Sequence, residues 1–275
     1  MLQLSIVPLS PVVGAEVVGI DICEPLDEDT TTQIRSALLE HLVLFFRDQA
    51  IDDDGLVRFA GAFGAVSIPA FRTKETERPD VMVLDQTDGR GQGADRWHSD
   101  NTFMAEPPLG SLLRADLVPD VGGDTGFASM YAAYESLSPR MQDFLDGLVA
   151  VHDITPLLEN AVRRGLSTAD LAETRATWPP VEHPIVRTHP ETGRKALYVN
   201  PEATVLIPAL PDAESRRVLD LLFDHVKSPE LQCRFRWRKG SVAFWDNRSA
   251  QHYGIADYNQ RRIMRRVTIA GDRPR

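Results

Sequence analysis

The feature that most limits the fold of this chain is a series of short strand-like segments that begins at Val81 and runs to about Gly271. Turn sequences such as PETG at 190–193 separate the segments. In chain order they read VMVL, GSLLRADLV, PIVRTHP, KALYVN, QCRFRW, SVAFWD and MRRVTIAG. Several short strands with turns between them predict an antiparallel sandwich or barrel.

The residues before this series mix strands with helices. LSIVPL, AEVVGI and VLFFRDQ predict strands, whereas DEDTTTQIRSALLEHL and DDDGLVRFAGAFG predict helices with acidic first turns. Three more helical stretches interrupt the later strands, near 138–148, 159–174 and 212–227. These helical stretches form a long insertion between strands. The strands before the insertion are too few to close a barrel, so we expect them to pair with the strands after it. The prediction is one domain over residues 1–275, mainly β with flanking helices (α+β).

The composition favours an ordinary globular enzyme in the cytoplasm. The 30 basic and 40 acidic residues give a net charge of -10, which would repel a nucleic-acid backbone. No apolar run approaches the roughly 20 residues of a membrane span, and the first residues do not resemble a signal peptide. With two cysteines, a disulfide framework or a cysteine-rich zinc module is not expected, so a metal would need His and carboxylate ligands.

The stretch DRWHSDNTF, residues 95 to 103, contains two such ligand types one residue apart. In an extended segment, residues i and i+2 project to the same side, so His98 and Asp100 would point together. The spacing suits two ligands of one metal. An ordinary hydrogen-bonded pair would produce the same pattern.

A third ligand candidate is His252, in the segment FWDNRSAQHYG that follows an apolar strand. Two histidines and one carboxylate are the set that binds one face of Fe(II) and leaves three positions open. The same groups could hold zinc for hydrolysis. The ligands alone leave the choice of metal open.

The segment QRRIMRRVTIAG predicts a strand that carries four arginines. Strand alternation places Arg262 and Arg266 on one face and Arg261 and Arg265 on the other. Two guanidinium groups inside a barrel require anions to neutralise them, and Arg binds carboxylate or sulfonate through two hydrogen bonds. The alternative is that this face is solvated.

Four segments together resemble the Fe(II)- and 2-oxoglutarate-dependent dioxygenases of the taurine dioxygenase (TauD/TfdA) group: RWHSDNTF, GGDTGFASMYAAYESLS, HPIVRTHPETGRKALYVN and WDNRSAQHYGIADYNQRRIMRRVTIAGD. The resemblance runs nearly end to end. It implies a double-stranded β-helix, which is a jelly-roll, cupin-like barrel. It also implies Fe(II), 2-oxoglutarate as cosubstrate and O2.

The resemblance also implies a role for particular residues. His98, Asp100 and His252 would be the iron ligands and the catalytic centre. Thr125 and Arg262 match the positions that hold the distal carboxylate of 2-oxoglutarate, and Arg266 matches the position that holds the sulfonate of taurine. Tyr253 is expected to line the substrate pocket, and Phe71 could shape it.

The expected substrate is a small organic anion hydroxylated next to a heteroatom, with an alkylsulfonate such as taurine first. The product would collapse to sulfite and an aldehyde, while 2-oxoglutarate gives succinate and CO2. The loop VSIPAFRTKE at 66–75 lacks the histidine by which the taurine enzyme helps bind sulfonate. Aryloxyalkanoates and alkyl sulfates are therefore alternative substrates for the same chemistry. The relatives form dimers or tetramers, so a homo-oligomer is expected.

Two functions of other classes compete with this interpretation. A zinc-dependent hydrolase on the same three ligands would lack an obvious general base and would leave the paired arginines unexplained. A non-catalytic barrel that binds small anions would tolerate loss of a ligand, whereas all three candidates are present.

Overall fold

Two β-sheets form the body of the molecule in the computed structural model, which describes residues 4–70, 78–87, 95–165 and 167–275. The large sheet has the order β1-β2-β3-β14-β6-β16-β4, with β5 also paired to β16. Its strands are β1 (Ser5–Pro8), β2 (Ala15–Val18), β3 (Val43–Phe46), β14 (Val242–Asp246), β6 (Gly110–Leu117), β16 (Arg262–Ile269), β4 (Val66–Ser67) and β5 (Met82–Gln86). The small sheet is β13 (Gln232–Phe235), β7 (Thr125–Ser129) and β15 (Ala250–Gly254), in that order. Only the β2–β3 pairing among these is parallel.

Strand alternation distributes the apolar side chains of the large sheet over two cores. In β14, Ala243 and Trp245 belong to the core that the two sheets share. Val242 and Phe244 belong to a second core on the other side of the large sheet. Because both faces are buried, the strand reads as a continuous apolar run. The arrangement is a double-stranded β-helix (jelly roll), and the predicted fold class is confirmed.

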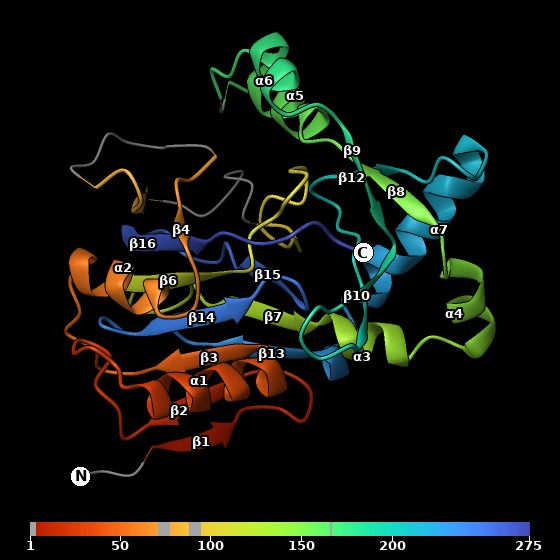
Figure 1. Cartoon of the computed structure of the whole chain (residues 1–275). Coiled ribbons are helices and arrows are strands. Elements are labelled where there is room, and N and C mark those ends of the chain that lie inside the picture. The colour runs from red at the N-terminus through yellow and green to blue at the C-terminus, as the bar shows by residue number, and fades with distance from the viewer. Residues whose placement is uncertain (1–3, 71–77, 88–94, 166) are drawn as a thin grey trace.

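Two helices cover the second core. They are α1 (Glu28–His41) and α2 (Asp53–Gly61), each capped by an aspartate, Asp27 or Asp52, whose side chain accepts from a first-turn N–H. Leu38 of α1 and Phe59 of α2 are among the side chains that bury this face of the sheet. Both helices were predicted, and Figure 1 shows them beside the large sheet.

The long insertion between β7 and β13 contains most of the other elements. They are α3 (Met130–Glu135), α4 (Pro139–Leu145), β8 (Val149–His152), α5 (Thr155–Arg163), α6 (Leu171–Thr177), β9 (Val181–Pro184), β10 (Val186–Thr188), β11 (Lys195–Leu197), β12 (Thr204–Leu206), α7 (Asp212–His225) and the 3-10 turn η1 (Pro229–Leu231). Helices α5 and α6 stand at one end of the molecule, connected to its body through β8 and β9 (Figure 1).

The prediction of one helical stretch over 159–174 is wrong. The structure has two short helices with a break after Arg163, where Gly165 adopts a left-handed φ of 70°. A residue in that conformation ends a helix, and glycine takes it without steric cost. The other two predicted stretches correspond to α4 and α7.

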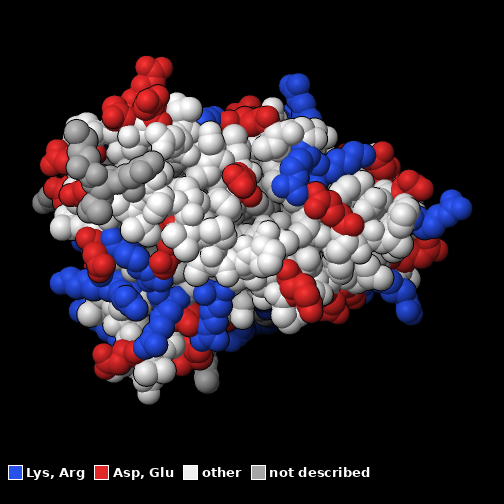
Figure 2. Space-filling view, turned by 90° about the horizontal axis from the view of Figure 1, so that it is seen from below, with Lys and Arg blue, Asp and Glu red and all other residues white. Residues whose placement is uncertain are grey.

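The seven predicted late strands all contain strand residues, whereas β7, β8, β12 and β15 were missed, as was all of β9 except Pro184. The missed strands are only three to five residues long. Among the described residues, no helix is long and apolar enough to cross a membrane. Basic and acidic side chains lie beside one another on the face in Figure 2.

Candidate metal centre and its cavity

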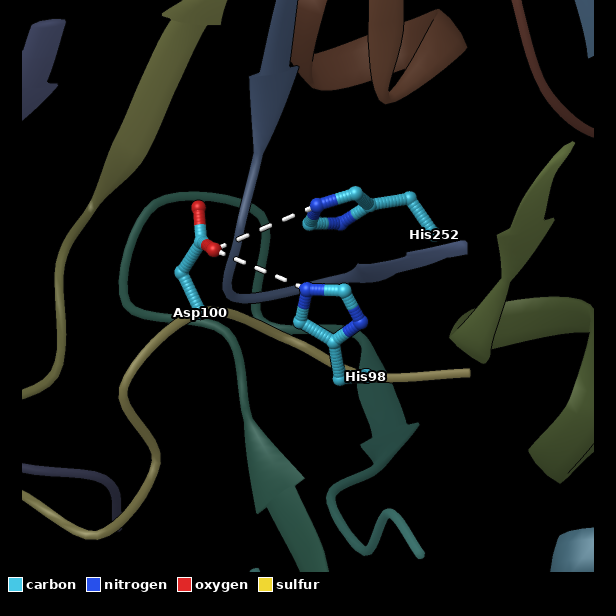
Figure 3. A group of neighbouring side chains, drawn as sticks. All are labelled: His98, Asp100 and His252. Carbon is cyan, nitrogen blue, oxygen red and sulfur yellow. Dashed lines mark ion pairs between the residues drawn. The ribbon is translucent and has the colours of Figure 1, made fainter. Parts of the chain in front are cut away.

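Three buried side chains lie close together: those of His98, Asp100 and His252. Asp100 Oδ1 lies 3.8 Å from His98 Nε2 and 3.9 Å from His252 Nε2. One ligand atom from each residue lies within 4.8 Å of the others. Figure 3 shows both imidazole rings turned towards the same carboxylate oxygen. The structure therefore brings together the three residues predicted as metal ligands.

The local backbone explains how His98 and Asp100 come together, and it differs from the prediction. The N–H of His98 donates to the carbonyl of His252 at 3.0 Å, and the reverse bond is 2.8 Å, so the two histidines form an isolated β-bridge. Asp100, however, is already in a turn, in which Asn101 has a left-handed φ of 53°. Asn tolerates that region better than most residues. A bridge followed by a turn, rather than a strand, aims the carboxylate at the rings.

Asp100 is held by three neighbours. Asn247 accepts from its N–H at 2.6 Å and donates to its C=O at 2.9 Å. Ser111 donates to Oδ2, and Arg266 Nη1 donates to Oδ1, both at 2.8 Å. Burial would raise the pKa of Asp100, but the positive charge of Arg266 and the hydrogen bond from Ser111 help to outweigh it, and the pKa is lowered to about 2. The group is thus a carboxylate at neutral pH.

The hydrogen bonds and burial of the histidines suit metal ligands. His98 Nδ1 lies 2.8 Å from the carbonyl oxygen of Arg96, which can only accept, so Nδ1 carries a hydrogen and Nε2 is the ring atom left to face a metal. Burial, with a smaller contribution from His98, lowers the pKa of His252 to about 3. Both Nε2 atoms face Asp100 Oδ1. His252 is therefore neutral at physiological pH, and its ring can offer a lone pair to a metal.

Strand β16 places its arginines as alternation predicted. Arg262 and Arg266 line the cavity beside the three ligands. Arg261 and Arg265 pair with acidic side chains away from it. The structure thus confirms that one face of the strand looks inward.

Arg262 is a buried cation with incomplete pairing. It is 7% exposed, forms no ion pair with any described residue, and its buried Nε finds no acceptor among them. Burial lowers its pKa. Thr125, at the start of β7, lines the same cavity, and its Oγ1 accepts a hydrogen bond of 2.9 Å from Trp237 Nε1. These two groups form a part of the cavity that suits an anion.

The cavity that contains all these groups has a volume of about 600 Å³. This is within the range for pockets that bind drug-sized ligands. One wall is apolar and comes from helix α5 and the residue before it: Ile154, Leu157, Leu158 and Ala161. Since α5 has no buried residue, its apolar face covers the cavity instead of the main core. Glu202 also lines the cavity, with Oε2 3.7 Å from His98 Nδ1.

Two further residues, Phe71 and Tyr253, were predicted to shape or line the substrate pocket. Phe71 lies outside the described residues. Tyr253 does not line the cavity: its ring packs 4.5 Å from that of Trp97 and against Gly126. As the neighbour of His252 in β15, Tyr253 projects to the opposite face of the strand, so the expectation that it lines the pocket is corrected.

Sequence reasoning missed Asn247, Trp237 and the role of helix α5 as a wall of the cavity. The first two act through contacts with Asp100 and Thr125, which are 147 and 112 positions away. For α5 a signal existed, because Leu157, Leu158 and Ala161 lie three and four residues apart, as on one helical face.

The cavity residues fit a transition metal and, beside it, an anionic ligand. Two ligand atoms that are each about 2.1 Å from one metal are at most about 4.2 Å apart, and both spacings from Asp100 Oδ1 satisfy this limit. Two imidazoles and one carboxylate suit a divalent first-row metal. The incompletely paired Arg262 beside the Thr125 hydroxyl fits a carboxylate ligand.

Comparison with known proteins agrees with this chemistry. The family model described as "Taurine catabolism dioxygenase TauD, TfdA family" matches residues 5–268. An alkylsulfatase of Acinetobacter baylyi is 35% identical over 98% of this chain and 86% of its own length. An alpha-ketoglutarate-dependent 2,4-dichlorophenoxyacetate dioxygenase of Cupriavidus pinatubonensis is 37% identical over 96% of this chain and 97% of its own. The crystal structure of a taurine dioxygenase from Burkholderia xenovorans superposes with a TM-score of 0.85 at 35% identity, covering 98% of this chain and 92% of that one.

Proposed function

The chain belongs to the TauD/TfdA family of 2-oxoglutarate-dependent dioxygenases, and we propose that it uses Fe(II) to hydroxylate an organic sulfonate or sulfate ester next to the heteroatom. The observation that carries the proposal is one cavity that contains a two-histidine, one-carboxylate set and two inward arginines of β16. A zinc hydrolase would use the three ligands but would give Arg262 no role.

His98, Asp100 and His252 would hold the iron. When bound, Fe(II) with 2-oxoglutarate and O2 supplies an oxidant strong enough to remove a hydrogen atom from carbon, with release of succinate and CO2. The protein orients the reactants and keeps bulk water from the reacting carbon. The bonds from Asn247 and Ser111 to Asp100 support this role, because they fix the carboxylate before any ligand binds.

Thr125 and Arg262 would bind the distal carboxylate of 2-oxoglutarate. The guanidinium of Arg262 lacks a carboxylate partner among the described residues. Because the group is buried, an anionic partner would stabilise its charge strongly. The hydroxyl of Thr125 would add a second donor. This pair would therefore distinguish 2-oxoglutarate from keto acids that lack the distal carboxylate.

Arg266 would bind the anionic head of the substrate. One of its nitrogens is engaged by Asp100, while its buried Nε has no acceptor among the described residues. An arginine has five N–H donors, so it can hold the iron ligand and a sulfonate or sulfate together. This double contact would place the substrate carbon next to the head group beside the metal.

The wall formed by α5 favours substrates with an alkyl chain. Leu157, Leu158 and Ala161 provide an apolar surface that taurine, with its ammonium group, would not complement. We therefore place alkyl sulfates and longer alkylsulfonates beside taurine as candidate substrates, and aryloxyalkanoates behind them. Hydroxylation next to the heteroatom gives an unstable product, which breaks down to an aldehyde and sulfate or sulfite.

We also propose that the protein is cytoplasmic and forms a homodimer or homotetramer. The resemblance to oligomeric relatives supports the second statement. Sedimentation equilibrium of the purified protein tests it, and a monomer at all concentrations would contradict it.

A substrate panel tests the proposed reaction. The protein with Fe(II), 2-oxoglutarate and O2 is incubated with taurine, a series of linear alkylsulfonates and alkyl sulfates, and an aryloxyacetate. We expect succinate to form in equal amount to sulfite or sulfate with at least one of the sulfur compounds. Turnover of none of them, or hydrolysis supported by Zn(II) without 2-oxoglutarate, would contradict the proposal.

A further inference from the structure

Trp237 connects the two groups that we assign to the distal carboxylate of 2-oxoglutarate. It follows β13, is 5% exposed and does not line the cavity. Its indole N–H donates to Thr125 Oγ1 at 2.9 Å. The guanidinium carbon of Arg262 lies 5.9 Å from the centre of its ring. One buried side chain thus contacts both groups without reaching the ligand space.

The hydrogen bond from Trp237 determines whether the Thr125 hydroxyl acts as a donor or as an acceptor towards the cavity. A threonine hydroxyl has one hydrogen to donate and two lone pairs, whereas an indole N–H can only donate. Since Trp237 occupies a lone pair, the hydroxyl hydrogen must point elsewhere. Among the residues that the structure describes, none accepts it, and Thr125 faces the cavity.

A hydroxyl oriented in this way is matched to a ligand that only accepts. An ionised carboxylate has acceptor sites and no donor. Without the indole N–H, the hydroxyl could rotate. Binding a carboxylate would then fix it in one orientation, and the entropy lost in doing so would weaken binding. The indole face also lies within the distance at which a guanidinium gains from an aromatic ring.

We infer that Trp237 is a positioning residue for the cosubstrate: it orients the Thr125 hydroxyl as a donor to the distal carboxylate of 2-oxoglutarate. The inference rests on the proposed function, because it takes 2-oxoglutarate as the ligand of this part of the cavity. It adds a residue that acts through Thr125 and never touches the ligand.

The test measures binding rather than turnover. Zn(II)-loaded protein, which does not consume 2-oxoglutarate, is titrated calorimetrically with 2-oxoglutarate and with pyruvate, which has the keto acid end but no distal carboxylate. Trp237→Phe keeps a ring beside Arg262 and removes the N–H. We expect it to raise the Kd for 2-oxoglutarate about 2- to 10-fold, the value of one hydrogen bond, and to leave the Kd for pyruvate unchanged.

A double-mutant cycle separates this role from a general effect on the fold. Thr125→Val should weaken 2-oxoglutarate binding, and adding Trp237→Phe to it should change the Kd little further. Trp178→Phe, in the small cluster around Phe103, is the matched control and should behave as wild type. Equal loss of pyruvate binding, or additive effects in the cycle, would overturn the inference.

A measurement on the unaltered chain covers the case in which Trp237→Phe does not fold. The chain has four tryptophans, so their indole N–H signals can be assigned in an NMR spectrum from variants of the other three. The Trp237 signal should shift with 2-oxoglutarate and stay in place with pyruvate. No shift with 2-oxoglutarate would reject the inference, whereas absence of any 2-oxoglutarate binding would reject the proposed function itself.

Discussion

Among single residues, Asn247 is the one on which the position of Asp100 most depends. Its amide bonds both the N–H and the C=O of Asp100, and it also donates to the carbonyl of Pro108 at 3.2 Å. The residue is fully buried, so water cannot replace these bonds in a variant without rearrangement. Asn247 therefore joins the end of β14 to the turn that carries a metal ligand.

Replacement of Asn247 by Ala should loosen the metal centre. We expect the affinity for Fe(II) or Zn(II) to fall about 10- to 100-fold, as for residues that hold a ligand in place. The free energy of unfolding should fall by about 2–4 kcal/mol, because buried backbone groups of Asp100 lose their partners. Competition with a chelator and urea unfolding measure the two effects. A normal metal affinity in a destabilised variant would show that Asn247 serves the fold alone.

Arg262 and Arg266 should separate the two anionic ligands. Arg262→Ala should raise the KM for 2-oxoglutarate, and Arg266→Ala the KM for the substrate, each by about 10- to 100-fold from loss of charge-assisted bonds. Because Arg266 also bonds Asp100, its variant should bind metal less tightly as well. Arg261→Ala is the control: its exposed ion pair faces away from the cavity and should change neither KM. Equal effects of both variants on both constants would show that the roles are misassigned.

The residues of the site differ in how far the sequence reveals them. The inward pair on β16 could be predicted because the period of two is a local property of a strand. Asp100 was identified for a partly incorrect reason, since a turn and not a strand aims it. Asn247 and Trp237 carry no local signal, because their roles exist only after distant segments pack together.

The element that most affects substrate choice is helix α5. Its apolar face covers the cavity, no residue of it is buried, and the helix belongs to a small cluster separate from the two main cores. Gly165 ends this segment of the chain in a left-handed conformation, which separates α5 from α6. The sequence indicated helix here but not the break, because the pattern of apolar residues continues across it.

Ala161→Phe should shorten the space for an alkyl chain. We expect kcat/KM for a long linear alkyl sulfate to fall at least about tenfold, in line with the discrimination of one or a few methylenes in an apolar pocket. Activity with a short sulfonate should change little. Glu159→Phe adds the same ring to an exposed position of α5 and is the matched control. Parallel loss for short and long substrates would contradict a role of α5 in chain length.

Across the whole molecule, Asp246 connects the large sheet to the insertion. It ends β14, is fully buried, and accepts from Arg248 at 2.6 Å, while its Oδ2 lies 3.0 Å from His189 Nε2. Burial would raise the pKa of Asp246, but Arg248 and His189 outweigh it and hold the pKa well below the usual value of 3.8. Arg248 in turn pairs with Glu191 at 2.8 Å in the loop after β10.

This network should make the fold sensitive to acid. The pKa of Asp246 is lower in the folded chain than in the unfolded chain, so on acidification the unfolded chain binds the proton first. The contribution of Asp246 to the free energy of unfolding is therefore complete at neutral pH and is lost as pH falls below about 5. Asp246→Asn should lower the free energy of unfolding at neutral pH by about 1–3 kcal/mol, because the buried Arg248 then keeps only Glu191 as a carboxylate partner and loses charge-assisted hydrogen bonds. Its stability should then decline less than that of wild type on acidification. Urea unfolding over a range of pH checks both, and parallel curves would contradict the assignment.

The most direct test of the metal centre and cosubstrate site is the visible spectrum of the protein with Fe(II) and 2-oxoglutarate in the absence of oxygen. We predict a weak charge-transfer band that saturates at about one iron per chain, as expected for the ligand set that the described residues form in the cavity. The band should be lost in His252→Ala and should require more 2-oxoglutarate in Arg262→Ala. No band in the wild-type protein, or an unchanged band in His252→Ala, would contradict the account.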